Sequence, residues 1–326
     1  MKMLFYPGCS MQHTARPYLD SLLAIRDDID LELDEVKDWN CCGATEYMSV
    51  HRLAAHALVG RNLALASQQQ QSSDGQCSTT LTAACSACYL NLAKTDQQMR
   101  EDPRLKASIN AALGSAGLGY QPGSLKVRHL LDVVCNDVGY EKIRAKVVRP
   151  LYGLKVAPYY GCQVIRPDPD ARWDNHEHPT AMDRLLQALG AQVVDYPLKT
   201  QCCGGHMTVI GPAVAYGLIR RLVHGAREAG AHLIATLCPM CQLNLDAYQV
   251  EMNKHFKSDY HVPVLYFTQL MGLAFGKSPA ELGIGKEFVA AAEALTNIQT
   301  EAPEAAKQKP KRRHRAEDGL PMPSME

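Results

Sequence analysis

Short apolar runs alternate with longer segments of helical periodicity along the chain. The strand-like runs lie at 2–6, 31–36, 78–84, 154–160, 191–196 and 231–237. Between those of the second half, apolar residues recur at three- and four-residue spacing over 179–189, 213–229 and 242–253. Strands that alternate with helices pair in parallel through crossovers, so the pattern predicts an α/β fold of small, mostly parallel sheets with flanking helices.

Three short motifs occur twice in the same order, which indicates an internal duplication. The matched pairs are 6–10 with 159–163, 40–43 with 201–204, and 85–92 with 238–245. We therefore expect two homologous Cys-Cys-Gly domains related by a pseudo-two-fold duplication. Their expected bounds are 1–150 and 151–276, followed by a partly flexible C-terminal extension at 277–326.

Five cysteines of each repeat follow its strand-like runs. The first set is Cys9, Cys41, Cys42, Cys85 and Cys88, and the second is Cys162, Cys202, Cys203, Cys238 and Cys241. The carboxyl ends of parallel strands meet at one edge of a sheet, where such folds bind ligands. Each set should therefore gather at one such edge.

Thiolates are soft ligands that select zinc, copper(I) or iron–sulfur clusters. A structural zinc site takes four ligands, so a fifth cysteine would be left over in both repeats. Adjacent cysteines diverge in an extended segment and suit a multinuclear cluster better than one ion. Common cubane clusters use four cysteines, so five point either to an unusual cluster or to one thiol that does not ligate. The glycines after each pair, Gly43 and Gly204, allow a tight turn and a close approach to inorganic sulfide.

Two other chemistries stay open at this point. A Cys-x-x-Cys motif at the start of a helix is also typical of a thioredoxin-like dithiol, although that chemistry needs only two thiols. A zinc-binding scaffold would use four thiols of each set, and a colourless rather than brown protein would reveal it. Cys77 and Cys135 have no counterpart in the other repeat and are expected to be buried cysteines outside the metal sites.

The overall composition limits the classes of partner and the cellular compartment that we expect. Lys plus Arg equals Asp plus Glu at 34 each among 326 residues, so no net field attracts nucleic acid or an anionic membrane. No stretch of 18 apolar residues and no secretory signal is evident, which predicts an intracellular, cytoplasmic protein without a membrane span. Twelve cysteines in a reducing compartment then favour metal or redox chemistry over disulfides. Hydrolase triads, Walker loops and Gly-x-Gly-x-x-Gly motifs are absent from the sequence.

A few features lie outside the cysteine motifs. His206 follows Cys-Cys-Gly-Gly and is a candidate to donate a hydrogen bond to sulfur or a proton to a substrate thiolate, although an ordinary packed or solvated histidine is the commoner case. The segment 67–75 reads as a polar insertion, and 114–123 as a glycine-rich loop between the halves. Residues 307–315 are strongly basic and read as a solvated tail, with docking to an acidic partner as the alternative.

From residue 1 to about 276 the sequence resembles the B subunit of heterodisulfide reductase, a family of paired Cys-Cys-Gly domains. Both cysteine sets carry the resemblance, together with 6–9, 129–132, 158–163 and 266–270. The interval between Cys42 and Cys85 is longer than in the family, and the basic tail lies outside the family core.

The resemblance implies an α/β domain in each half that holds one non-cubane [4Fe-4S] cluster through five cysteines, with all ten as ligands. It also implies a disulfide or sulfur-carrier substrate between the clusters, a ferredoxin-like C subunit and a flavoprotein A subunit as partners, and a place in sulfur metabolism. A rival within the same domain family is the iron–sulfur subunit of a lactate, glycolate or succinate oxidation complex.

Overall fold

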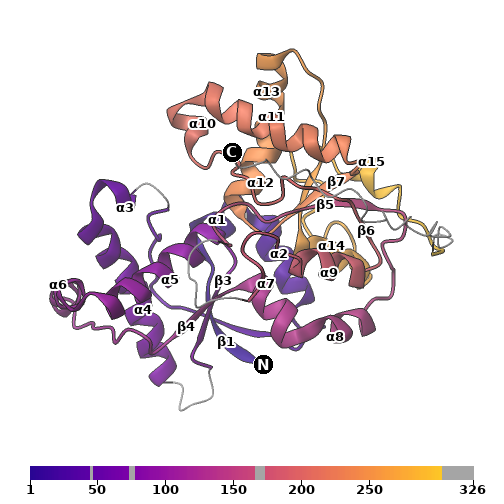
Figure 1. The fold of residues 1–326 in the computed structure, drawn as a ribbon. Coiled ribbons are helices and arrows are strands. Elements are labelled where there is room, and N and C mark those ends of the chain that lie inside the picture. Colours follow the sequence, from indigo (N-terminus) through magenta and orange to yellow (C-terminus); the bar gives the residue numbers. More distant parts are fainter. Residues whose placement is uncertain (45–46, 73–77, 166–172, 303–326) are drawn as a thin grey trace, which may run out of the picture.

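The computed structural model describes residues 1–44, 47–72, 78–165 and 173–302. Each half of the chain forms a four-stranded parallel sheet, ordered β2-β1-β3-β4 in the first half and β6-β5-β7-β8 in the second (Figure 1). The strands are β1 Lys2–Tyr6, β2 Glu32–Glu35, β3 Thr80–Ala83, β4 Lys126–His129, β5 Lys155–Tyr159, β6 Gln192–Val193, β7 Leu233–Thr236 and β8 Val264–Tyr266. The identical strand order confirms the predicted α/β fold of two homologous parallel-sheet halves.

The fourth strand of each sheet is not among the runs predicted from the sequence. β4 has the sequence Lys-Val-Arg-His, in which only Val127 is aliphatic, and β8 has only three residues. Both strands nevertheless pair along their length with the buried strand beside them, β3 and β7. Tertiary pairing rather than local apolar character therefore defines them.

Helices cover the sheets and connect their strands. They are α1 Gly8–Gln12, α2 Arg16–Ile25, α3 Tyr47–Val50, α4 Arg52–Gln71, α5 Ser86–Glu101, α6 Pro103–Gly114, α7 Leu130–Asp132, the π-helical η1 Val133–Gly139, α8 Tyr140–Ala145, α9 Ala181–Ala188, α10 Met207–Ile210, α11 Pro212–Glu228, α12 Pro239–Ala247, α13 Gln249–Phe256, α14 Phe267–Ala274 and α15 Ala292–Leu295. The helix predicted over 242–253 is two helices, α12 and α13, which meet at Tyr248.

The predicted polar insertion is in part the end of a helix. Helix α4 continues through Gln71, and Gln69 fastens it to the end of β2 by accepting the N–H of Lys37 and donating to the carbonyl of Glu35. The glycine-rich segment 114–123 does form a loop, but it precedes β4 inside the first half rather than joining the halves. The run of glutamines is polar because one face of α4 is solvated, not because the chain leaves the fold there.

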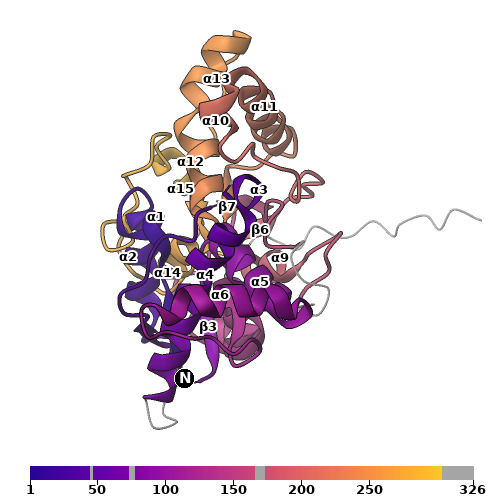
Figure 2. The same cartoon turned by 90° about the vertical axis from the view of Figure 1, so that its left-hand side faces the viewer.

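The two halves meet through helices that are equivalent in the duplication. Helix α2, which follows the first strand of its sheet, packs on α14 of the other half, and α9 packs on α8 in the reciprocal way. Tyr18 stacks on Tyr266 with ring centroids 4.2 Å apart, and the Ser21 and Thr268 hydroxyls lie 2.6 Å apart. Both views show the first half below and α11 and α13 of the second half at the top (Figures 1 and 2). This interface brings the carboxyl ends of β3 and β7 toward each other.

The segment after α14 packs against the second half. The Asp246 carboxylate on α12 accepts the backbone N–H groups of Phe288 and Val289, and Gln269 of α14 donates to the carbonyl of Leu282. The basic stretch at 307–315 lies outside the described residues. Among the helices within the described ranges, none combines the length and the apolar character needed to cross a bilayer.

Candidate metal centres

All ten motif cysteines lie at or just beyond the carboxyl ends of strands. Cys9 is in α1 after β1, Cys85 caps α5 after β3, and Cys238 caps α12 after β7. The Cys-Cys-Gly segments follow β2 and β6, the outermost strands on the side of each sheet opposite β4 and β8. Three loops of each half therefore deliver thiols to one edge of its sheet, as the strand pattern predicts.

The five thiols of the first half form a continuous series of contacts. The Sγ atoms of Cys9 and Cys41 lie 3.7 Å apart, and those of Cys42 and Cys88 lie 3.4 Å apart. Cys42 lies close enough to Cys41, and Cys88 close enough to Cys85, to lower the pKa of that thiol. Cys9, the member most distant in sequence, is thus brought to the other four.

The second set repeats this arrangement around Cys241. Its Sγ lies 3.6 Å from that of Cys203, and Cys238 is close enough to add to the rise in its pKa that Cys203 causes. Cys162 and Cys203 both lie close enough to the Tyr159 hydroxyl to raise its pKa, after the larger effect of burial. The described thiols are graded in exposure, because Cys9, Cys41 and Cys202 are exposed and Cys162 is half-buried, whereas the other six motif cysteines are buried.

Each Cys-Cys-Gly turn is closed by its glycine. Gly43 and Gly204 adopt φ values of +77° and +100°, a region that L side chains avoid. Their N–H groups donate to the first sulfur of the pair, over 3.4 Å to Cys41 and 3.3 Å to Cys202. The turn therefore folds back on its own thiolate, which supports the role predicted for the glycine.

Two tyrosines hold these turns at equivalent places in the two halves. The Tyr6 hydroxyl donates to the carbonyl of Asn40 at 2.6 Å, and the Tyr159 hydroxyl donates to the carbonyl of Gln201 at 2.7 Å. Burial and the neighbouring Cys88, Cys42, Cys41 and Cys9 raise the pKa of Tyr6, so its hydroxyl stays protonated and keeps donating. Each carbonyl belongs to the residue just before the cysteine pair.

Two asparagines hold the far side of the same turns. The Asn91 amide donates to the carbonyls of Cys42 and Ala44, and the Asn244 amide donates to those of Cys203 and Gly205. Both side chains are buried and come from the helix that begins with the Cys-x-x-Cys motif. These tyrosines and asparagines were not selected as site residues from the sequence. Their repetition at matched positions in the two halves was the feature that would have identified them.

The two thiol sets touch each other. Cys85 of the first half and Cys238 of the second lie close enough for each thiol to shift the pKa of the other, raising that of Cys85 and lowering that of Cys238. Tyr18, Tyr266 and His129 surround this junction and are almost completely buried. Any group held by one set would therefore be a close neighbour of a group held by the other.

Hydrogen bonding between thiols makes their ionisation uneven. The bonds with Cys42 and then Cys9 lower the pKa of Cys41, whereas the bond with Cys41 raises the pKa of Cys9. In the second half, the bond with Cys241 lowers the pKa of Cys238, and the bond with Cys203 raises the pKa of Cys241. Metal binding requires thiolates, so filling such a set releases protons.

The spacing of the sulfurs suits metal ligation. Two thiolates on one tetrahedral ion at about 2.3 Å lie roughly 3.8 Å apart, close to the Cys9–Cys41 and Cys203–Cys241 separations of 3.7 and 3.6 Å. A Cβ added to Gly8 or Gly161 would come within 2.9 Å of the Cys88 sulfur or 3.1 Å of the Cys241 sulfur, so glycine keeps both cradles open. In the described part of the chain, no three His, Cys, Asp or Glu side chains are already placed around one ion. A soft, multinuclear group fits this donor set.

The sequence model of a domain family described as the cysteine-rich domain, CCG, matches the chain twice, over residues 3–93 and 156–246. The chain belongs to the family of paired CCG-domain proteins that includes the heterodisulfide reductase B subunits. Both matched segments contain one complete thiol set. The family resemblance predicted from the motifs is confirmed.

Relatives of this CCG protein align over most of its length. It is 35% identical to the 8-methylmenaquinol:fumarate reductase membrane anchor subunit of Wolinella succinogenes, over 87% of this chain and 96% of that one. It is 30% identical to the B subunit of the ferredoxin/F420H2-dependent CoB-CoM heterodisulfide reductase of Methanosarcina acetivorans, over 91% and 97%. The B subunit of a ferredoxin:CoB-CoM heterodisulfide reductase of Methanosarcina mazei is 32% identical over 82% and 88%. All three relatives are named as subunits of reductases.

A solved structure shares the fold. A hypothetical protein from Helicobacter pylori superposes with a TM-score of 0.68 at 13% identity, covering 89% of this chain and 52% of that one. At this identity the likeness concerns the architecture alone.

The remaining predicted residues lie as follows. His206 caps the start of α10 and is close enough to Cys41 of the other half for its charge to lower the pKa of that thiol. Cys135 is buried in η1, where its thiol faces the carbonyl of Ala181, so it lies apart from the CCG motifs. Cys77 lies outside the described residues.

Proposed function

We propose that this CCG protein is the iron–sulfur B subunit of a heterodisulfide reductase-like complex, in which ten cysteines hold two non-cubane [4Fe-4S] clusters. The observation that carries the proposal is the gathering of the thiols into two sets with Sγ–Sγ separations of 3.4 to 3.7 Å, which adjoin across the interface of the halves at Cys85 and Cys238. When bound, two such clusters supply or accept one electron each, which matches the two electrons and two protons that convert a disulfide into two thiols.

The chain's own residues define what happens around the junction. Tyr18, Tyr266 and His129 form a buried wall that excludes water on one side, and the exposed Cys9, Cys41 and Cys202 leave the other side open to a substrate. His206 lies near Cys41, one of these exposed thiols. In this proposal His206 holds the proton that a newly formed substrate thiolate takes up.

The proposed substrate is a disulfide or carrier-bound sulfur, in sulfur metabolism. The proposed partners are a ferredoxin-like C subunit and a flavoprotein A subunit, because this chain carries no dinucleotide-binding motif through which electrons could enter directly. The relatives named as heterodisulfide reductase subunits support this assignment.

Counting iron in cysteine variants tests the ligand sets. Anaerobically purified Cys241→Ala should lose about half of the iron and sulfide, because Cys241 belongs to the second set alone. Cys135→Ala, at a buried cysteine outside both sets, should keep the full complement. Addition of a thiol or disulfide substrate should change the electron paramagnetic resonance spectrum of the wild type. Full iron in Cys241→Ala, or zinc in place of iron, would overturn the proposal.

A second candidate is a component of a quinol-linked dicarboxylate reductase or oxidase. It is favoured by the 35% identity to the fumarate reductase subunit of Wolinella succinogenes. The two candidates separate when the chain is purified with its native partner subunits and assayed. Turnover of a disulfide with a viologen dye supports the first, and turnover of fumarate or succinate with a quinone analogue supports the second.

A further inference from the structure

The two halves have equivalent hollows beside their edge strands, and these hollows differ in what fills them. In each half a hollow lies between the helix that begins with Cys-x-x-Cys and the edge strand, β4 or β8. Tyr89 and Gln242, the residues just after each Cys-x-x-Cys motif, line corresponding places in the two hollows. Asp132 and Gln269, the third residues of the helices after each edge strand, do so as well. The two hollows are therefore the same feature of the duplicated fold.

The chain's own C-terminal segment occupies the hollow of the second half. Asp246 on α12 accepts the N–H groups of Phe288 and Val289, and Gln269 donates to the carbonyl of Leu282. Leu282 packs so closely on α14 that a Cβ on Gly272 would come within 2.2 Å of it. Only about 270 Å³ of open space remains beside this segment.

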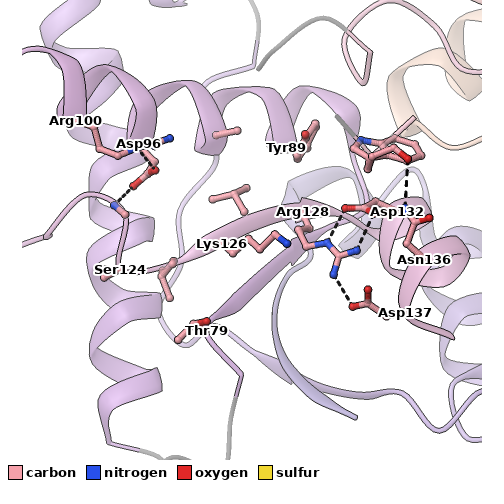
Figure 3. A pocket seen from close by; sticks show the side chains of 15 residues that line it. Thr79, Tyr89, Asp96, Arg100, Ser124, Lys126, Arg128, Asp132, Asn136 and Asp137 are labelled. Carbon is pink, nitrogen blue, oxygen red and sulfur yellow. Dashed lines mark hydrogen bonds and ion pairs between the residues drawn. The ribbon is translucent and has the colours of Figure 1, made fainter. Parts of the chain in front are cut away.

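Among the described residues, no segment of the chain occupies the hollow of the first half. This hollow measures about 720 Å³ and runs along β4 between α5 on one side and the helical turns α7 and η1 on the other (Figure 3). At the position of Asp246 the first half has Ala93, which removes a carboxylate and leaves room. None of the ten motif cysteines lines this groove, so it is separate from the candidate metal centres.

The groove still has hydrogen-bond donors to offer. Arg128 donates from Nε and Nη2 to the carboxylate of Asp132, and from Nη1 to that of Asp137. Two of its five N–H groups therefore remain without one of these bonds. Lys126, on the same strand, is exposed and has no ion-pair partner among the described residues. The acceptors are largely taken, because Asp132 also accepts from Asn136, and one Asp96 oxygen accepts from both Tyr120 and Gly123.

We infer that this groove along β4 binds an extended, acidic segment of another subunit of the complex, with a carboxylate of that segment on Lys126 and its main-chain carbonyls on the remaining N–H groups of Arg128. The segment takes the place that residues 282–289 of this chain take in the other half. Main-chain contacts hold such a segment, and the cationic Lys126 selects its acidic residues. The inference rests on the proposed membership of a multi-subunit complex, but it does not depend on the ligand sets or the substrate.

Lysine footprinting and zero-length cross-linking test the groove directly. The probe is the complex of the full chain with its co-expressed partner subunits, compared with the chain alone. In the complex, acetylation of Lys126 should slow at least tenfold, and a carbodiimide should join Lys126 to an Asp or Glu of a partner. Lys94 is a matched control, because it is exposed on α5 but does not line the groove.

Charge reversal separates docking from folding. Lys126→Glu should weaken the partner's binding at least tenfold, whereas Lys94→Glu should leave it unchanged. Both variants should retain the wild-type iron content, so a failure of the cluster assignment would be visible separately. Equal acetylation of Lys126 in the chain and the complex would overturn the inference. So would a cross-link to a second copy of this chain, or protection of Lys126 by a small dicarboxylate such as succinate alone.

Discussion

Cys85 and Cys238 come from different copies of the duplicated unit, yet their thiols lie close enough for each to shift the pKa of the other. Each sits at the N-terminal cap of the helix that follows the third strand of its half. Because the contact crosses the interface, a change on one side should be felt on the other. Residues at the outer, exposed end of a set should lack this effect.

We expect Cys238→Ala to perturb both centres, whereas Cys202→Ala perturbs only its own. The reason is that Cys238 lies beside Cys85 of the first set, whereas Cys202 is exposed to solvent. Electron paramagnetic resonance of the reduced variants is the measurement, with the first-half signal shifted or broadened only in Cys238→Ala. Identical first-half signals in the two variants would contradict electronic contact through this junction.

Gly161→Ala should destabilise the protein by about 1–3 kcal/mol and lower its iron content. Gly161 has φ +72°, and an added Cβ would stand 3.1 Å from the Cys241 sulfur. Chemical unfolding of the wild type and the variant gives the difference in free energy.

Gly217→Ala provides the control, since Gly217 lies within α11 and an added Cβ would meet nothing within 4 Å. This substitution should stabilise the helix by about 0.5–1 kcal/mol. If the two variants behaved alike, the close approach at Gly161 would have no role in the site.

Lys199→Met should destabilise the protein by about 3–5 kcal/mol. The Lys199 ammonium lies 2.9 Å from the Asp183 carboxylate with only 7% of its side chain exposed, and Asp183 also accepts from the Tyr160 hydroxyl. Removal of the cation leaves a charge of the second half unpaired beside Tyr160. Arg144→Met, at the exposed pair with Glu141, should change stability by less than about 0.5 kcal/mol in the same denaturation assay.

Stability should fall as the pH is lowered from 7.5 to 5.5, in part because of His129. Burial lowers the pKa of this histidine to about 4, whereas an unfolded histidine titrates near 6.5. Over this range the unfolded chain binds a proton that the folded protein does not, so acid favours unfolding. The loss from this one group should be about 1 kcal/mol at pH 5.5.

The variant His129→Asn isolates this contribution. Asparagine can still accept the Leu131 N–H that His129 accepts at the start of α7, but it does not titrate. Urea unfolding at several pH values should therefore show a smaller loss toward pH 5.5 in the variant. Parallel curves for the two proteins would show that His129 already titrates normally in the folded state.

The parts of the fold that the duplicated motifs define could be predicted from the sequence. The duplicated motifs determined the two halves, and the position of each cysteine after a strand placed the thiols at the sheet edges. β4 and β8 were missed because their sequences are short or polar, and their pairing with β3 and β7 is a long-range contact that no local pattern records.

The site was predictable only in part. The cysteines were found because thiols are rare and repeated, whereas the roles of Tyr6 and Asn91 depend on carbonyls far away in sequence. The proximity of His206 to Cys41 depends on how the halves pack, which neither repeat encodes alone. Matched positions in the two copies nevertheless carry this information, since Tyr159 and Asn244 repeat the same bonds.

A chain made of two copies of one unit has each surface groove twice. A partner could therefore bind to either copy, in two orientations. The segment that leaves α14 and bonds to Asp246 covers the groove of the second copy, and no described residue takes the same place in the first. One molecule of the chain therefore offers a partner one groove, and the partner can bind in one orientation. The two thiol sets thus keep the symmetry of the duplication, whereas the outer surface loses it and would bind one partner segment per chain.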